Sequence, residues 1–203
     1  MTPSLKKFSA MTTEEWAEHD KYVREKSAEE RAEKDLAAKN AALSAMEIPA
    51  RVLEVLRGKV QPTEATAQLD GGALIVCLSG NPGNGKTIAA ASWLYNRGAG
   101  LFVKAPHLAR WERYDDAKMK RLLSAPALVV DDLGTEYQDA KGNFMALFDE
   151  LLDYRYDHRL AMVMTTNLDA AQFTERYGAR IVDRIREAGA FASVSAPSMR
   201  VAP

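Results

Sequence analysis

One stretch of the sequence, residues 73–87, restricts the fold more than any other. It reads ALIVCLSGNPGNGKT, in which an apolar run over Leu74–Leu78 is followed by GNPGNGKT. The second part satisfies the pattern G-x-x-x-x-G-K-[ST] of a phosphate-binding loop, which joins a strand to a helix. Glycines at positions 80, 83 and 85 allow positive φ angles and leave the main-chain amides uncovered. The stretch therefore predicts a strand, an anion-binding loop and a helix, in that order.

The residues of this loop differ in the role that we expect for them. The main-chain amides, together with the positive end of the helix that begins near Gly85, would hold the α- and β-phosphates of ATP. Lys86 would reach the β- and γ-phosphates, and the hydroxyl of Thr87 would bind Mg²⁺. A glycine-rich turn that contains a lysine by chance is the alternative, but the flanking strand and helix patterns favour nucleotide binding. The expected nucleotide-binding residues are Gly80, Asn81, Pro82, Gly83, Asn84, Gly85, Lys86 and Thr87.

Composition restricts the remaining possibilities. The 203 residues suffice for one α/β core with an appendage, and a net charge of −1 provides no bulk positive field, so any DNA contact would need a local basic patch. The single cysteine, Cys77, cannot form an internal disulfide or a cysteine-cluster zinc site, and we interpret it as a small buried residue. No apolar run approaches the ~20 residues of a membrane span, and the N-terminal residues lack a secretory signal. We therefore expect a cytoplasmic protein with no membrane partner.

The N-terminal part of the chain differs from the rest in composition. Residues 12–45 are dominated by Ala, Glu, Lys and Arg and contain no Gly or Pro, which predicts helix. Thr12 with Glu15, and Ser27 with Glu30, have capping-box spacing, so one long helix or two shorter ones are possible. Apolar residues are too sparse for a separate core. We expect residues 1–46 to form a charged helical arm, either solvated or partner-binding, and residues 47–203 to form an ATPase domain.

Strand-like and helix-like segments alternate from residue 73 onward, which favours a parallel sheet with helices on both faces and a ligand beyond the carboxyl ends of the strands. A short helix over Ala50–Leu56 and a connector over Pro62–Gly72 precede them. The expected strands are Leu74–Leu78, Leu101–Lys104, Ala127–Val130, Leu160–Thr165 and Phe191–Ser195. The expected helices are Lys86–Asn96, a stretch within Ala105–Leu123, Lys141–Tyr156 with one apolar face, and Asp169–Glu187.

Two carboxylates follow the third expected strand. Asp131 and Asp132 end the apolar run at residues 128–130, which is the form of a Walker B segment. We expect Asp131 to hold Mg²⁺ together with Thr87, and Asp132 to polarise the attacking water. Acidic residues are common at strand ends, so this pattern alone does not indicate a metal site. It does so in combination with the phosphate-binding loop that precedes it in the chain.

The fourth expected strand also ends in polar residues. Asn167, with Thr166 beside it, is placed to hydrogen-bond the γ-phosphate or the attacking water. Asn167 and Asp169 also precede the next helix, and Asp169 with Gln172 has capping-box spacing. Both readings hold together, since Asp169 suffices as the helix cap.

Two arginines, Arg180 and Arg184, lie on one face of the last expected helix. Like charges four residues apart disfavour a helix slightly unless an anion faces them. The arginines face an acidic neighbour, such as Asp183 or Glu187, or simply water, or else the γ-phosphate bound to a neighbouring subunit, which an arginine finger would reach in trans.

Five motifs of this chain occur together in one known family. GNPGNGKT, LVVDDLG, MTTN, YGARIVDRI and the late Ser198-Met199-Arg200 resemble, in order and approximate spacing, the AAA+ ATPases that include the DnaC and DnaI helicase loaders and the IstB transposition helper. The resemblance covers about residues 48–200. It implies a P-loop NTPase fold of α/β class with sheet order 5-1-4-3-2, and a homo-oligomer with ATP at subunit junctions and single-stranded DNA along its inside.

The same resemblance assigns further residues. It implies that Arg184 is the trans arginine finger, with Arg180 as the second choice, and that Arg200 is the late cis arginine that contacts the nucleotide. The N-terminal zinc module of many loaders has no counterpart, since a charged arm occupies its place. We also expect no C-terminal lid domain. Members of this family differ mainly in the partner-binding appendage, so residues 1–46 are expected to bind a replicative helicase or a transposase.

A basic stretch over residues 104–121 bears on DNA. It reads KAPHLARWERYDDAKMKR and mixes cations with Trp111 and Tyr114, a combination that can hold phosphates and stack bases. Asp115 and Asp116 weaken the patch, and a solvated helix is the alternative. The candidate residues for single-stranded DNA are Lys104, Arg113, Lys118 and Lys120.

The sequence thus predicts a Mg²⁺-dependent ATPase that acts as a helicase loader in DNA replication. Two alternatives remain open at this point. One is an IstB-like transposition helper that works on duplex DNA, and the other is a nucleotide-gated interaction protein in which ATP hydrolysis is incidental.

Overall fold

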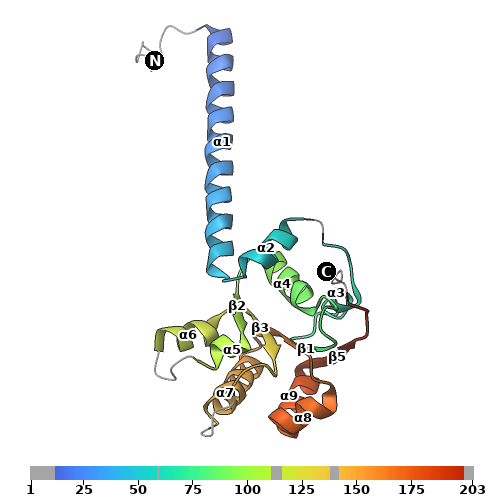
Figure 1. Ribbon diagram of the computed structural model, residues 1–203. Coiled ribbons are helices and arrows are strands. Elements are labelled where there is room, and N and C mark those ends of the chain that lie inside the picture. Colours follow the sequence, from blue (N-terminus) through green and yellow to red (C-terminus); the bar gives the residue numbers. More distant parts are fainter. Residues whose placement is uncertain (1–11, 59, 111–115, 138–141, 199–203) are drawn as a thin grey trace. The chain divides into compact units, whose positions relative to one another are not determined.

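A computed structural model of the chain describes residues 12–58, 60–110, 116–137 and 142–198 (Figure 1). Contacts between Cα atoms divide the chain into two compact units, Met1–Ala41 and Ala42–Pro203. This division falls before the expected boundary at residue 46. The reason is that Met46 is fully buried in the core of the second unit, where its carbonyl accepts a hydrogen bond of 2.7 Å from the Phe102 amide.

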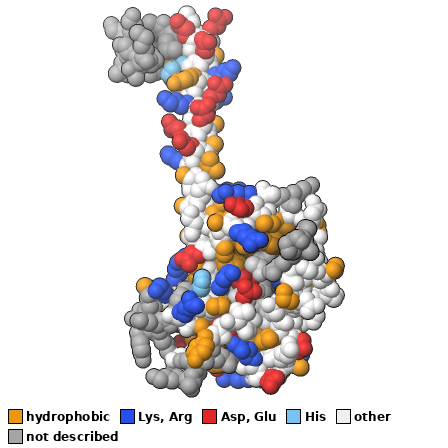
Figure 2. Space-filling view, in the orientation of Figure 1, with side chains coloured by type: hydrophobic (Ala, Val, Ile, Leu, Met, Phe, Trp, Pro, Cys, Tyr) orange, Lys and Arg blue, Asp and Glu red, His pale blue; other side chains and the backbone are white. Residues whose placement is uncertain are grey.

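The first unit consists of most of helix α1 (Thr13–Ala45), a single helix rather than two. Thr12 and Glu15 exchange hydrogen bonds at its start, so the first predicted capping box is confirmed. Ser27 does not start a second helix, because its hydroxyl donates to the Val23 carbonyl 2.6 Å away inside the continuous helix. No described residue of α1 in this unit is buried, and basic and acidic side chains are interspersed along it (Figure 2).

The second unit is built on five parallel strands in the order β2-β3-β4-β1-β5. Read from the other edge this is 5-1-4-3-2, so the expected sheet order is confirmed. Strand β3 continues through the two aspartates, with a register shift between Val130 and Leu133, and β5 begins two residues earlier than expected. The strands are β1 (Ile75–Gly80), β2 (Leu101–Lys104), β3 (Ala127–Leu133), β4 (Ala161–Thr166) and β5 (Gly189–Val194).

The helices follow the expected order with three differences. Two helices, Ala105–Leu108 and Asp116–Ser124, occupy the region in which one helical stretch was expected. The segment expected to be one helix over Asp169–Glu187 divides at Gly178, whose φ of 90° ends one helix and begins another. The connector before β1 contains a short helix that Thr63 caps. The helices of this unit are α2 (Ala50–Arg57), α3 (Glu64–Ala67), α4 (Lys86–Arg97), α5 (Ala105–Leu108), α6 (Asp116–Ser124), α7 (Asn143–Asp157), α8 (Ala170–Tyr177) and α9 (Ala179–Ala188).

Side chains of alternate strand residues build two cores, one on each face of the sheet. Val76 and Leu78 pack with α2, α3 and α4, whereas Ile75 and Cys77 pack with α5 to α9. The predicted apolar face of α7 is confirmed, since its five residues are buried: Phe144, Leu147, Phe148, Leu151 and Leu152. Helices therefore cover both faces of the sheet, except at the edge strand β5, which is partly exposed, and polar residues of the sheet gather at the carboxyl ends of β3 and β4.

Candidate nucleotide-binding site

The loop between β1 and α4 has a backbone that requires glycine at several positions. Gly80, Gly83 and Gly85 have φ angles of 151°, 89° and 87°. A Cβ atom at Gly80 would lie 2.3 Å from the Val194 carbonyl oxygen and 2.6 Å from the Asn84 Nδ2 atom. The loop therefore turns against the end of β5 and leads into the start of α4, where a phosphate would gain from the helix dipole.

Lys86 lies inside this loop and is 6% exposed. Its Nζ atom donates to the carbonyl oxygens of Gly80 and Asn81, 2.6 and 2.9 Å away, and to the Oδ1 atoms of Asn84 and Asn167, 3.0 and 3.2 Å away. These four acceptors are uncharged, so a triphosphate is a stronger partner for the ammonium group. The contact with Asn167 places the tip of β4 beside the loop, as expected.

The Thr87 hydroxyl donates to Asp131 Oδ1 over 2.8 Å, so helix α4 and strand β3 meet at this pair. Asp131 is fully buried, and its Oδ1 also accepts from the Thr165 hydroxyl at 2.8 Å. Its Oδ2 has no hydrogen-bond partner among the described residues. Burial raises the pKa of Asp131, and the neighbouring Asp132 charge raises it further. A buried carboxylate oxygen without a partner, next to a hydroxyl, suits a small oxygen-seeking cation such as Mg²⁺.

Asp132 follows directly and adopts a left-handed backbone with φ 61°. Its side chain is 40% exposed and lies 3.9 Å from the Lys104 ammonium at the end of β2. A cavity of about 200 Å³ brings the predicted residues together, and its lining is Pro82, Gly83, Asn84, Gly85, Lys86, Thr87, Asp132 and Asn167. The two aspartates thus diverge: Asp131 points into the protein toward Thr87, and Asp132 points into the cavity.

Arg180 and Arg184 do not line this cavity. Arg180 pairs with Asp149 at 3.2 Å and Asp153 at 2.6 Å, and Arg184 pairs with Asp153 at 3.1 Å and lies over the Tyr156 ring. The sequence-based choice of Asp183 or Glu187 as acidic partner was wrong, because the aspartates come from α7 across the helix interface. Arg180 is the more accessible of the two arginines, with 63% of its side chain exposed against 24% for Arg184.

Several residues that the sequence placed in the site or in a DNA-binding patch do not line the cavity. Arg121 pairs with Glu47 and donates to the Ala45 carbonyl, whereas Lys118 and Lys120 are exposed on α6. Thr166, expected beside Asn167, donates to the Leu133 carbonyl at 2.8 Å. The predicted cap of α8 by Asp169 and Gln172 is confirmed. The residues outside the described part of the chain include Arg113 and Arg200, together with Trp111 and Tyr114.

Sequence reasoning missed three residues of this region: Thr165, Lys104 as a partner of Asp132, and Glu136. Thr165 and Lys104 lie at strand ends. Because parallel topology brings strand ends together, their positions in the sequence could have predicted that they lie near the site. Glu136 lies beyond β3 in a stretch with no pattern that predicts burial. In the described part of the chain, no helix combines the length and apolarity that a bilayer crossing requires, and no cluster of three His, Cys, Asp or Glu side chains forms a metal site.

Comparison of the structure with solved structures places the fold. The DnaC helicase loader is 23% identical over 71% of this chain and 86% of its own, with a TM-score of 0.52. DnaI is 22% identical over 74% of this chain and 95% of its own, with a TM-score of 0.56. AMPPCP-bound DnaA from Aquifex aeolicus is 17% identical over 70% of this chain and 44% of its own, with a TM-score of 0.50.

The sequence itself matches no protein-family model and no curated protein. The structural likeness therefore establishes the fold alone: the chain has the fold of the DnaC helicase loader, DnaI and DnaA, with a P-loop between β1 and α4 of a five-stranded parallel sheet.

Proposed function

We propose that this protein is a Mg²⁺-dependent ATPase. The observation that carries the proposal is the hydrogen bond between Thr87 and Asp131 beside a glycine-rich loop and a cavity. Each of these features occurs in proteins that bind no nucleotide. Together they provide amides for the phosphates, a cation for the terminal phosphates and two oxygen ligands for a metal ion.

The residues in and beside the cavity have separate roles in binding the phosphates, holding the metal ion and orienting the water. The loop amides hold the α- and β-phosphates, and Lys86 exchanges its contacts with Gly80 and Asn81 for the β- and γ-phosphates. Thr87 and Asp131 hold Mg²⁺, which when bound supplies positive charge to the phosphate oxygens. Asp132 orients the attacking water and accepts its proton, and Asn167 hydrogen-bonds the γ-phosphate or that water.

Completion of this site requires a second subunit. Among the described residues, Lys86 is the cation that lines the cavity, and the two candidate fingers, Arg180 and Arg184, lie outside it. We propose that one of them enters the site of a neighbouring subunit in a homo-oligomer, with the late Arg200 acting in cis.

The cellular role that we propose is that of a helicase loader in DNA replication, acting on single-stranded DNA and a replicative helicase. The shared fold of DnaC and DnaI supports this role, as does the arm, which displays Trp16, Tyr22, Val23 and Leu36 as exposed residues. Exposed aromatic and aliphatic side chains on a charged helix suit a protein partner. They favour equally a second candidate, a nucleotide-gated interaction protein, and an IstB-like transposition helper remains the third.

One experiment tests the enzymatic part. ATP turnover per subunit is measured across protein concentrations with Mg²⁺, for the wild type and for Asp131→Asn. We expect turnover to rise with concentration as junctions form, and the variant to be inactive. A variant as active as the wild type contradicts the proposed metal site, and a flat concentration profile contradicts a shared site. Comparing duplex with single-stranded DNA affinity across salt concentrations distinguishes the loader from the transposition helper.

A further inference from the structure

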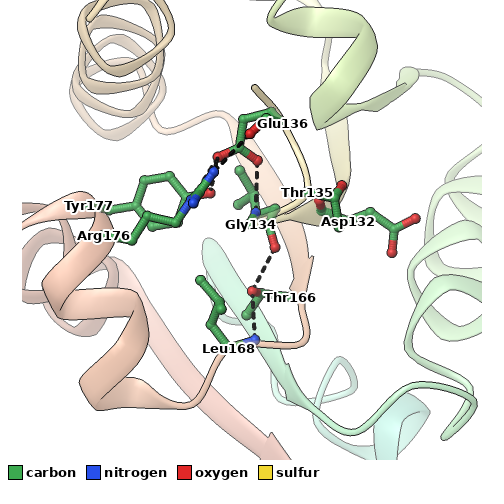
Figure 3. Close-up of polar contacts among 9 residues, drawn as sticks. Asp132, Gly134, Thr135, Glu136, Thr166, Leu168, Arg176 and Tyr177 are labelled. Carbon is green, nitrogen blue, oxygen red and sulfur yellow. Dashed lines mark hydrogen bonds and ion pairs between the residues drawn. The ribbon is translucent and has the colours of Figure 1, made fainter. Parts of the chain in front are cut away.

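Glu136 is a buried carboxylate outside the nucleotide cavity. The residue is 3% exposed and its side chain is fully enclosed. Its Oε2 atom accepts from the Gly134 amide at 2.8 Å, and its Oε1 atom accepts from the Tyr177 hydroxyl at 2.6 Å and from the Arg176 guanidinium at 2.9 and 3.0 Å (Figure 3). Enclosing a carboxylate is unfavourable by several kcal/mol unless its partners are complete, and here they are.

The turn that Glu136 closes carries Asp132. In this turn the Thr135 hydroxyl donates to the Asp132 carbonyl at 2.6 Å, and the Asp132 amide donates to the Thr165 hydroxyl at 3.0 Å. The left-handed backbone of Asp132 is less favourable than a right-handed one for a residue with a side chain. Such a conformation persists only where the surroundings impose it. The direction of the Asp132 side chain therefore depends on what fixes this turn.

Two groups of contacts fix the turn, one on each side. On the side of β4, the Thr166 hydroxyl donates to the Leu133 carbonyl, and a Cβ atom at Gly134 would lie 3.0 Å from the Leu168 side chain (Figure 3). On the side of α8, Glu136 provides the anchor, because Arg176 donates both to its carboxylate and to its carbonyl, the latter at 2.8 Å. Loss of the Glu136 charge weakens the second side, where the bond from Arg176 to the main-chain carbonyl is kept, while the contacts of the first side stay unchanged.

The anchor also lies at a junction between helices. Arg176 and Tyr177 are the last two residues of α8, and Gly178 separates them from α9. Helix α9 carries Arg180 and Arg184, the candidate fingers for a neighbouring subunit. One buried carboxylate thus holds both the turn that bears Asp132 and the helix end from which the finger helix starts.

We infer that Glu136 is a positioning residue for ATP hydrolysis, which aims Asp132 at the attacking water and fixes the start of the helix that presents the finger. This inference rests on the proposed ATPase function. A purely structural anchor is the competing explanation, and it predicts lower stability with unchanged turnover per folded subunit.

The decisive variant is Glu136→Gln. Glutamine has nearly the same size, but it carries no charge and its amide group replaces one acceptor oxygen with a donor. Either the Gly134 amide loses its acceptor, or Arg176 and Tyr177 both lose the oxygen that they share. We expect kcat to fall at least ten-fold while the dissociation constant for ATP stays within two-fold of the wild-type value. If Asp132 is no longer held in place, the attacking water is poorly oriented and kcat falls. ATP affinity is unaffected, because the loop holds the phosphates.

Arg155→Met is the matched control for stability. Arg155 is equally buried and donates to main-chain carbonyls, among them that of Ala161 at the start of β4, at the opposite end of the strand from the cavity. We expect it to lower Tm at least as much as Glu136→Gln but to leave kcat within two-fold of the wild type. A similar loss of kcat in both variants, or none in Glu136→Gln, overturns the inference.

A second pair of measurements keeps the inference testable if one variant folds poorly. Arg176→Met removes the cation that pairs with Glu136. Because Arg176 acts through Glu136, kcat of the double variant Glu136→Gln with Arg176→Met should be no more than about two-fold below that of either single variant. Amide hydrogen exchange over residues 132–136 should accelerate at least ten-fold in Glu136→Gln and stay unchanged in Arg155→Met.

These outcomes separate the inference from the proposed function. A wild-type protein that hydrolyses no ATP removes the proposed function, whatever Glu136 does. Unchanged exchange over residues 132–136 in Glu136→Gln, or additive losses in the double variant, overturns the inference while an ATPase that depends on Asp131 still stands.

Discussion

Thr87 and Asp131, separated by 44 positions in the chain, are joined by a hydrogen bond of 2.8 Å between a hydroxyl and a buried carboxylate. The bond ties the first turn of α4 to the end of β3, which is not adjacent to β1 in the sheet. The pair brings together two oxygen ligands of the kind that Mg²⁺ prefers.

Asp131→Asn should stabilise the nucleotide-free protein while abolishing its response to Mg²⁺. Burial, and then the charge of Asp132, raises the pKa of Asp131, so the folded state binds a proton more tightly than the unfolded state does. The free energy of unfolding therefore falls as pH rises through this raised pKa. Removing the charge should raise Tm at pH 7 by about 2–4 °C, with the difference vanishing near pH 4, as measured by calorimetry.

Asp132→Asn is the control for that measurement. Because its side chain is 40% exposed, its charge is solvated, and we expect Tm to stay within about 1 °C of the wild type. A Tm of Asp131→Asn below that of the wild type at pH 7, or a remaining increase on adding Mg²⁺ with ATP, would contradict the assignment of Asp131.

Gly80→Ala should unfold the protein at moderate temperature even without nucleotide. The new Cβ atom meets the Val194 carbonyl oxygen at 2.3 Å, and neither backbone can yield without separating β1 from β5. We expect a loss of more than about 3 kcal/mol in the free energy of unfolding, measured by denaturant titration. Gly142→Ala is the matched control, since its φ is also positive at 66° but its Cβ would meet no atom of the described residues within 4 Å. We expect it to lower the free energy of unfolding by about 1–2 kcal/mol. Equal losses would contradict the steric explanation.

Truncation should be tolerated up to residue 41 and not up to residue 46. A chain that begins at Ala42 keeps Met46, which is fully buried, whereas one that begins at Glu47 loses it. Removal of a buried methionine side chain typically reduces stability by about 2–5 kcal/mol. We expect the first chain to match the full-length protein in Tm and ATP turnover, and the second to unfold at lower denaturant. Similar midpoints for both chains would show that Met46 contributes little.

Alanine variants of the two α9 arginines should separate the trans finger from its neighbour. The finger variant should lose the part of ATP turnover that depends on protein concentration and keep ATP affinity, because the residue acts only at a neighbouring site. Their ion pairs with Asp149 and Asp153 are partly exposed and each adds at most about 1 kcal/mol, so Tm should change little. Arg186→Ala, exposed on the same helix, is the control. Loss of ATP affinity alone in both variants would indicate a cis or structural role.

Local chemistry in the sequence was enough to predict much of the site. A phosphate-binding loop has a strict pattern because only glycine permits its backbone, and the two aspartates follow an apolar run that can only be a buried strand. Given parallel strands, the loop, the aspartates and Asn167 had to meet at one edge of the sheet. The alternation of segments likewise predicted five strands, and the resemblance supplied their order.

Other features depended on contacts between distant segments, which no local pattern encodes. The break at Gly178 was missed because the helix pattern continues through it, and the acidic partners of Arg180 were misassigned because α7 approaches from elsewhere in the chain. Glu136 gave no sign of burial, since an isolated glutamate in a polar stretch is normally solvated. By itself the sequence determined where the glycine-rich loop lies and which backbone it adopts, because backbone conformation is a local property. Only the tertiary structure decided which of two adjacent aspartates points to Thr87 and which to the cavity, because that depends on what packs around the turn.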